Sequence, residues 1–135
     1  MESFIRFLKV FDCRPLEHIL HLSGVWLEKL TKLPDCKIEG IHLELPGYTD
    51  DPTLEIFSYQ PENTNGATQQ LNSFGLAHLA FHVDNIKEIL EKLIAYKGRQ
   101  YGEIMFHKYP EIGTLSVVYA SDPDGNFIEI QHWSR

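Results

Sequence analysis

The segment from Gly75 to Gln131 constrains the fold most, because strand and helix patterns follow one another closely along it. The apolar run Leu76–Val83 is short and is bounded by turn residues, so it predicts a strand. The next run, Ile86–Ile94, has apolar residues at three- and four-residue steps, which is the spacing of an amphipathic helix. Asn85 stands where its side chain can cap the start of that helix.

Three further strands are predicted after this helix, because alternating apolar and polar residues recur in three runs. The runs are Glu103–His107, Thr114–Ala120 and Asn126–His132, and the sequence Asp-Pro-Asp-Gly at 122–125 predicts a turn between the last two. The segment therefore predicts the order β-α-β-β-β.

The first half of the chain repeats part of this pattern. Alternating strands are predicted over Ile38–Leu45 and Thr53–Tyr59, and a short helix is predicted between Gly24 and Leu33. The two strands resemble the pair that flanks the turn at 122–125, which indicates a degenerate duplication. We therefore predict a single domain over residues 1–135, with module one at about 1–60, a connector at about 60–74 and module two at about 75–132.

Charge and apolar patterning exclude several classes of partner. The formal net charge of −7 argues against nucleic acid and anionic membranes, because both favour clustered Lys and Arg. No apolar run has the length of a membrane-spanning helix, and none resembles a signal peptide, so we expect a cytoplasmic protein. Cys13 and Cys36 lack the spacing of a metal or redox motif and are expected to be reduced packing residues.

Carboxylate and imidazole side chains are predicted on one wall of the sheet, because side chains two apart on a strand share a face. His78 and His82 point away from the helix, as does Glu129 on the last strand, and Glu55 lies on an earlier strand. An ionised carboxylate on an enclosed face is costly unless it is paired or bound to a cation. A metal satisfies this requirement. The simpler alternatives are an Arg or Lys partner for Glu129 and a neutral core role for His78.

Two runs carry a resemblance to a known family: Gly75-Leu-Ala-His78-Leu-Ala-Phe-His-Val-Asp-Asn and Tyr119-Ala-Ser-Asp-Pro-Asp-Gly-Asn-Phe-Ile-Glu129-Ile. They resemble the vicinal oxygen chelate superfamily, which includes glyoxalase I, methylmalonyl-CoA epimerase, extradiol dioxygenases and the bleomycin- and fosfomycin-resistance proteins. The resemblance implies an α+β fold, in which paired βαβββ modules form a U-shaped cleft. It also implies a metal bound by Glu55, His78, Glu129 and a residue on the first strand of module one.

The start of the chain departs from the family pattern. We match Met1–Phe7 to the family's first helix and Leu8–Asp12 to its second strand, so module one is expected to lack its first strand and the ligand on it. His42 or His82 is then a candidate replacement ligand. The sheet edge left exposed favours pairing with another chain, so we expect a homodimer.

The resemblance implies a metal-dependent enzyme of the glyoxalase and epimerase type. A divalent ion (Ni, Zn, Co, Mn or Fe) would hold two vicinal oxygens of a small-molecule substrate and stabilise an enediolate-like intermediate. Glu129 or Glu55 is the expected base, in a lyase or isomerase similar to lactoylglutathione lyase. The dioxygenase branch is less favoured, because the missing ligand is normally one of its two His residues.

Two other functional classes stay open at this point. The first is a metal-free protein of the same fold that binds or sequesters a small molecule, and the second is a nonfunctional fragment. Four histidines have no supporting constellation and are expected at the surface: His18, His21, His107 and His132.

Overall fold

A computed structural model describes the chain except for residues 1, 17, 49–51, 64–69, 74 and 77, and the side chains of residues 2–4 are also not described. The chain divides into two compact units. The first comprises residues 12–66, and the second comprises residues 2–11 together with 67–135. Each unit is described by itself.

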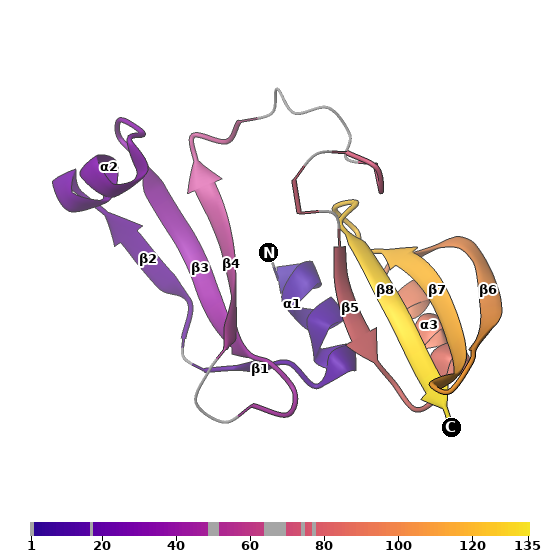
Figure 1. Ribbon diagram of the computed structural model, residues 1–135. Coiled ribbons are helices and arrows are strands. Elements are labelled where there is room, and N and C mark those ends of the chain that lie inside the picture. Colours follow the sequence, from indigo (N-terminus) through magenta and orange to yellow (C-terminus); the bar gives the residue numbers. More distant parts are fainter. Residues whose placement is uncertain (1, 17, 49–51, 64–69, 74, 77) are drawn as a thin grey trace. The chain divides into compact units, whose positions relative to one another are not determined.

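The elements confirm the predicted α+β fold class. In chain order they are α1 (Glu2–Leu8), the 3-10 helix η1 (Lys9–Phe11), β1 (Arg14–Pro15), β2 (Leu20–Ser23), α2 (Val25–Thr31), β3 (Lys37–Glu44), β4 (Thr53–Gln60), β5 (His78–His82), α3 (Ile86–Ala95), β6 (Arg99–Tyr109), β7 (Gly113–Ser121) and β8 (Phe127–Ser134) (Figure 1). Among the described residues, no helix is long and apolar enough to cross a membrane.

The first unit is an antiparallel sheet built around β3. Strands β1 and β2 pair with β3 over different parts of its length, and β4 pairs with β3 along its whole length. A small core forms where Leu27 of α2 packs with Cys36 and Ile38, and Phe57 lies against this cluster. Gly40 allows that approach, because a Cβ at this position would collide with the Phe57 ring.

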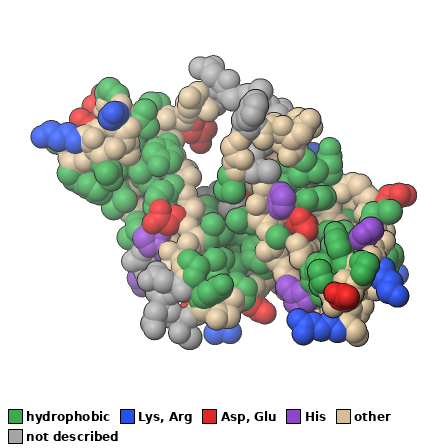
Figure 2. All heavy atoms as spheres, viewed as in Figure 1, with side chains coloured by type: hydrophobic (Ala, Val, Ile, Leu, Met, Phe, Trp, Pro, Cys, Tyr) green, Lys and Arg blue, Asp and Glu red, His purple; other side chains and the backbone are tan. Residues whose placement is uncertain are grey.

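Helix α2 exposes most of its apolar side chains. Leu27 is 1% exposed, whereas Trp26 is 55% and Leu30 is 71% exposed. Figure 2 shows hydrophobic side chains at the surface in this region. One buried side chain, Leu27, therefore anchors the helix, and Trp26 and Leu30 lie largely exposed.

The second unit is a four-stranded sheet in the order β5-β8-β7-β6, with α3 packed on one face (Figure 1). Strand β5 runs parallel to β8, while the other neighbours are antiparallel. The pairing of β6 with β7 is irregular between Tyr101 and Met105, and Gly102 in that stretch has φ +78°. The predicted β-α-β-β-β order is confirmed.

Local interactions explain where α3 starts and stops. The Asn85 side chain accepts a hydrogen bond from the backbone N–H of Glu88 at 3.2 Å, which caps the first turn. After the helix, the N–H of Gly98 donates to the Leu93 carbonyl at 2.9 Å. A Cβ at Gly98 would lie 2.6 Å from the Phe7 ring, so the glycine lets α1 pack closely on this unit.

The prediction of a strand over Leu8–Asp12 is wrong, because α1 is followed directly by the 3-10 helix η1. The apolar residues Phe7, Leu8 and Phe11 are buried, and their three- and four-residue spacing suits a helix better than a strand. Phe11 stacks on Phe81 of β5 with ring centroids 4.2 Å apart. The contact fixes the end of η1 against the second unit.

Candidate functional site

A histidine and a glutamate meet on the face of the second sheet that α3 does not cover. His78 opens β5 and Glu129 lies on β8, and the parallel register makes them diagonal neighbours. The Nε2 atom of His78 is 3.0 Å from Oε2 of Glu129, and the side chains are 31% and 13% exposed. The structure therefore brings together two of the three residues that the sequence indicated as metal ligands.

Tyr119 of β7 is the second partner of this carboxylate. It lies directly opposite Glu129 in the antiparallel register, and its O–H donates to Oε2 at 2.9 Å. Its ring also meets the imidazole of His78 edge to face, with centroids 5.2 Å apart. Burial raises the pKa of Tyr119, and the hydrogen bond to Glu129 and the charge of Glu129 raise it further. The phenol therefore stays protonated, as a donor, throughout the neutral pH range.

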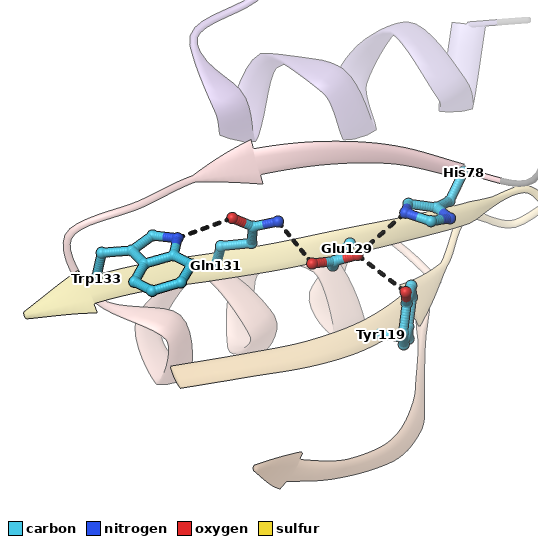
Figure 3. A network of polar contacts seen from close by, with 5 residues as sticks. All are labelled: His78, Tyr119, Glu129, Gln131 and Trp133. Atoms are coloured by element: carbon cyan, nitrogen blue, oxygen red, sulfur yellow. Dashed lines mark hydrogen bonds and ion pairs between the residues drawn. The ribbon is translucent and has the colours of Figure 1, made fainter. Parts of the chain in front are cut away.

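The other carboxylate oxygen is occupied by a chain of two residues on the same strand. The amide nitrogen of Gln131 donates to Oε1 of Glu129 at 2.6 Å, and the indole Nε1 of Trp133 donates to Oε1 of Gln131 at 3.1 Å. Figure 3 shows the five side chains joined in one network, with Glu129 at its centre. Gln131 shares this face because it follows Glu129 by two residues on β8, and the sequence pattern alone gave it no role. Trp133 was not among the predicted site residues, although the same two-residue alternation extends to it.

The turn after β7 sets where β8 begins. Asp122 is 1% exposed, and its Oδ1 accepts hydrogen bonds from the backbone N–H groups of Asp124 at 2.9 Å and Asn126 at 2.7 Å. Its Oδ2 accepts a further bond from the Asn126 side chain at 2.7 Å. Because this turn leads into β8, it also fixes the register in which Tyr119 faces Glu129.

Glu55, the remaining predicted ligand, lies in the first unit. It is the direct cross-strand partner of His42, whose Nε2 lies 3.4 Å from Oε1 of Glu55. The Glu55 side chain is 57% exposed, so water can solvate its carboxylate and the charge does not require a bound cation. His42 on β3 thus has the place beside Glu55 that Tyr119 on β7 has beside Glu129.

The donors in the second unit fit a divalent ion in chemistry and separation. Two ligands that each lie about 2.1 Å from an ion, at a right angle, are about 3.0 Å apart. The 3.0 Å between Nε2 of His78 and Oε2 of Glu129 matches this separation. Among the described residues, no group of three or more His, Cys, Asp or Glu side chains is placed to hold a metal. Of the three predicted ligands, His78 and Glu129 contact each other in the second unit, and Glu55 belongs to the first unit.

The other ring nitrogen of His78 is unusual. Its Nδ1 atom is buried and has no hydrogen-bond partner among the described residues. Buried ring nitrogens are generally paired, and a metal-bound histidine usually donates its second N–H to an acceptor. Within the described part of the chain, the imidazole of His78 is therefore positioned by the contacts of its Nε2 atom and of its ring.

His132 is the one histidine whose expected position was wrong. It is half-buried, and its Nδ1 lies 2.9 Å from the carbonyl oxygen of Val83, to which it donates. Its ring also stacks on His82, with centroids 5.9 Å apart. The reason is that β5 ends at His82, and the chain then turns across the side of β8 that carries His132. His18, His21 and His107 are exposed, as expected.

Comparison with known proteins identifies a family. The sequence profile described as "Glyoxalase/Bleomycin resistance protein/Dioxygenase superfamily" matches residues 39–130. No curated protein matches the sequence.

Solved structures show the same fold. A glyoxalase family protein from Bacillus cereus is 18% identical, with a TM-score of 0.83 over 100% of this chain and 87% of its own. A glyoxalase family protein from Enterococcus faecalis is 19% identical, with a TM-score of 0.58 over 97% of this chain and 87% of its own. A genomically encoded fosfomycin resistance protein from Listeria monocytogenes is 16% identical, with a TM-score of 0.54 over 99% of this chain and 82% of its own.

Proposed function

Because this chain belongs to the glyoxalase/bleomycin resistance protein/dioxygenase superfamily, we propose that it is a metal-dependent enzyme of the glyoxalase and epimerase type. It would act on a small molecule with vicinal oxygens through an enediolate-like intermediate. Members of this superfamily bind small-molecule substrates and commonly use divalent metal ions. The observation that carries the proposal is the contact of His78 with the largely buried carboxylate of Glu129, at 3.0 Å.

The residues of the second unit have defined roles in this proposal. His78 and Glu129 would hold the ion, which when bound supplies positive charge to stabilise a developing oxyanion on the substrate. Glu129 or Glu55 would be the base that takes up and returns a proton, and Oε2 of Glu129 is the oxygen that His78 and Tyr119 both contact. Tyr119 donates to that oxygen and holds the carboxylate in place.

Metal analysis is the first test. The protein is purified without chelator, its metal content is measured by mass spectrometry, and uptake of Ni, Zn, Co, Mn and Fe is measured by calorimetry. We expect about one ion per chain, with affinity lowered by on the order of 100-fold or more in His78→Ala and Glu129→Gln. His107→Ala, which changes an exposed histidine of the same unit, is the matched control. A wild-type protein that neither retains nor takes up any of these ions would exclude the metal-dependent reaction.

Activity is tested on small α-hydroxycarbonyl compounds and thiol adducts of dicarbonyls. Proton abstraction next to a carbonyl exchanges that proton with solvent, so NMR in deuterium oxide detects it even when no net product forms. We expect exchange in the metal-loaded wild type and none above background in Glu129→Gln. The prediction that Glu55 is a further ligand or the base is tested by Glu55→Gln in the same two assays.

A metal-free binding protein of the same fold is the second candidate. It is favoured by the absence of a three-residue donor group among the residues that the structure describes. In that case Trp133, which is joined to Glu129 through Gln131, would report ligand binding by a fluorescence change without any metal. Binding of an aromatic ligand with unchanged affinity in His78→Ala would support this candidate over the enzyme.

We also expect a homodimer. Within the described residues β4 pairs only with β3, so its other edge has no strand partner there, and an unpaired edge favours the addition of a strand from a second chain. Light scattering coupled to size-exclusion chromatography measures the mass directly, and a monomer at all concentrations would contradict this expectation.

A further inference from the structure

The orientation of the Gln131 side chain is fixed by Trp133. An indole N–H can only donate, so the atom of Gln131 that it contacts at 3.1 Å must be the amide oxygen. The amide NH₂ group then faces Glu129, where it lies 2.6 Å from Oε1. This assignment follows from the chemistry of the three groups, since a reversed amide would place two donors against each other.

The two oxygens of Glu129 are therefore not equivalent. Oε1 accepts from Gln131, whereas Oε2 faces Tyr119 at 2.9 Å and His78 at 3.0 Å. Because Glu129 is only 13% exposed, few water molecules can reach the carboxylate and compete for either oxygen. The carboxylate is held at both ends, from Trp133 on one side and from β7 on the other (Figure 3).

We propose that Gln131 and Trp133 are positioning residues, which commit Oε1 of Glu129 to a hydrogen bond and leave Oε2 as the oxygen that binds a divalent ion with His78. The inference rests on the proposed function, and it adds that Glu129 is a single-oxygen ligand. Hydrogen-bond partners of metal ligands typically change metal affinity by 10–100-fold when removed. The indole of Trp133 would act on the ion only through Gln131 and Glu129.

Cobalt binding tests this inference, because the visible absorption of Co²⁺ depends on the number and arrangement of its ligand atoms. Trp133→Phe removes the indole N–H and keeps an aromatic ring, which can still pack beside Tyr109. Gln131→Met removes the amide at similar volume. Both variants should bind Co²⁺ about 10-fold more weakly and with a changed visible spectrum, because Glu129 becomes free to rotate and use both oxygens. Trp26→Phe, which changes the other tryptophan, in the first unit, should bind as the wild type does.

A measurement without metal independently tests the relay, which is the chain of hydrogen bonds from Trp133 through Gln131 to Glu129. The ¹H–¹⁵N spectrum contains two indole signals, which Trp26→Phe assigns. Glu129→Gln removes the charge at the end of the relay, so the indole signal of Trp133 should move while that of Trp26 stays in place. A merely structural role for Trp133 would lower thermal stability in Trp133→Phe and leave both the Co²⁺ spectrum and this coupling unaffected.

The outcomes separate this inference from the proposed function. If the wild type and both variants bind Co²⁺ with the same affinity and spectrum, the relay is overturned while the metal site stands. If the wild type binds no Co²⁺, the proposed function and the single-oxygen ligation both fail. If the indole signal of Trp133 does not respond to Glu129→Gln, the relay itself is overturned, with or without metal. Should Trp133→Phe fail to fold, Gln131→Met decides the cobalt result.

Discussion

Replacement of Asp122 by alanine should destabilise the second unit by about 2–3 kcal/mol. The buried side chain accepts three hydrogen bonds, two from backbone N–H groups and one from the Asn126 amide. Hydrogen bonds to a charged group contribute about 1.5–3 kcal/mol each. Loss of all three would therefore cost about 4.5 kcal/mol or more of unfolding free energy if every donor were left unpaired. Asp124 and Asn126 are exposed, however, and their freed donors regain water, which returns roughly half of that value.

The two tryptophans allow this loss to be measured in the correct unit. A Trp26→Phe background leaves Trp133 as the only tryptophan, so its fluorescence during urea unfolding reports the second unit alone. We expect the unfolding free energy from the urea curve to fall by about 2–3 kcal/mol with little change in its slope, and the apparent melting temperature in a thermal scan to fall by about 6–12 °C.

Asp124→Ala is the control, because that side chain is exposed and its backbone N–H, which a substitution keeps, makes the contact to Asp122. It should change the unfolding free energy by less than about 0.5 kcal/mol. A loss below about 1 kcal/mol in Asp122→Ala, or an equal loss in the control, would show that the turn is not held by this carboxylate.

Three further outcomes follow from burial and from pKa shifts. The folded-state pKa of Tyr119 is raised above its ordinary value of 10.0. The stability linked to its proton is therefore fully present below about pH 10 and is lost as the pH rises through the folded pKa. Urea midpoints of the wild type should fall more steeply above pH 10 than those of Tyr119→Phe, and parallel curves would contradict this. Burial, and then the charge of Asp12, raises the pKa of the Cys13 thiol to about 11. In a Cys36→Ser variant, Ellman's reagent at pH 8 should therefore label Cys13 slowly in the folded protein and rapidly in urea. Equal labelling rates would disprove this prediction. Leu27→Ala should cost about 2–4 kcal/mol and Leu30→Ala less than about 0.5 kcal/mol in chemical denaturation, because only Leu27 is buried, and comparable losses would mean that α2 is covered in solution.

The second unit could be predicted from the sequence because its signals are local. Alternation between His78 and Val83, the capping residue Asn85 and the Asp-Pro-Asp-Gly turn each act over a few residues, and all three indicate the observed elements. Strand direction then places Glu129 on the same face as His78, which is why the central pair of the candidate site could be predicted. The family match over residues 39–130 confirms the resemblance that these motifs suggested.

The rest could not be predicted because it depends on tertiary contacts. Phe7 and Phe11 are apolar in a run short enough to suit either a strand or a helix, and packing against Gly98 and Phe81 decides for the helix. The roles of Gln131 and Trp133 depend on which side chains meet across 2.6–3.1 Å, which strand periodicity alone does not resolve. Whether Glu55 joins His78 and Glu129 stays a prediction.

The irregular pairing of β6 bears on self-association of the protein through an exposed strand edge. Strand β6 runs for 11 residues and, within the described part of the chain, pairs only with β7. Its exposed side chains include Met105 and Phe106, which would favour the addition of a strand from another molecule. The interruption between Tyr101 and Met105 divides the edge into short runs, and the left-handed backbone of Gly102 turns it out of line. The apolar side chains of β6 therefore lie beside an interrupted strand edge, which is a poorer template for aggregation than a continuous one.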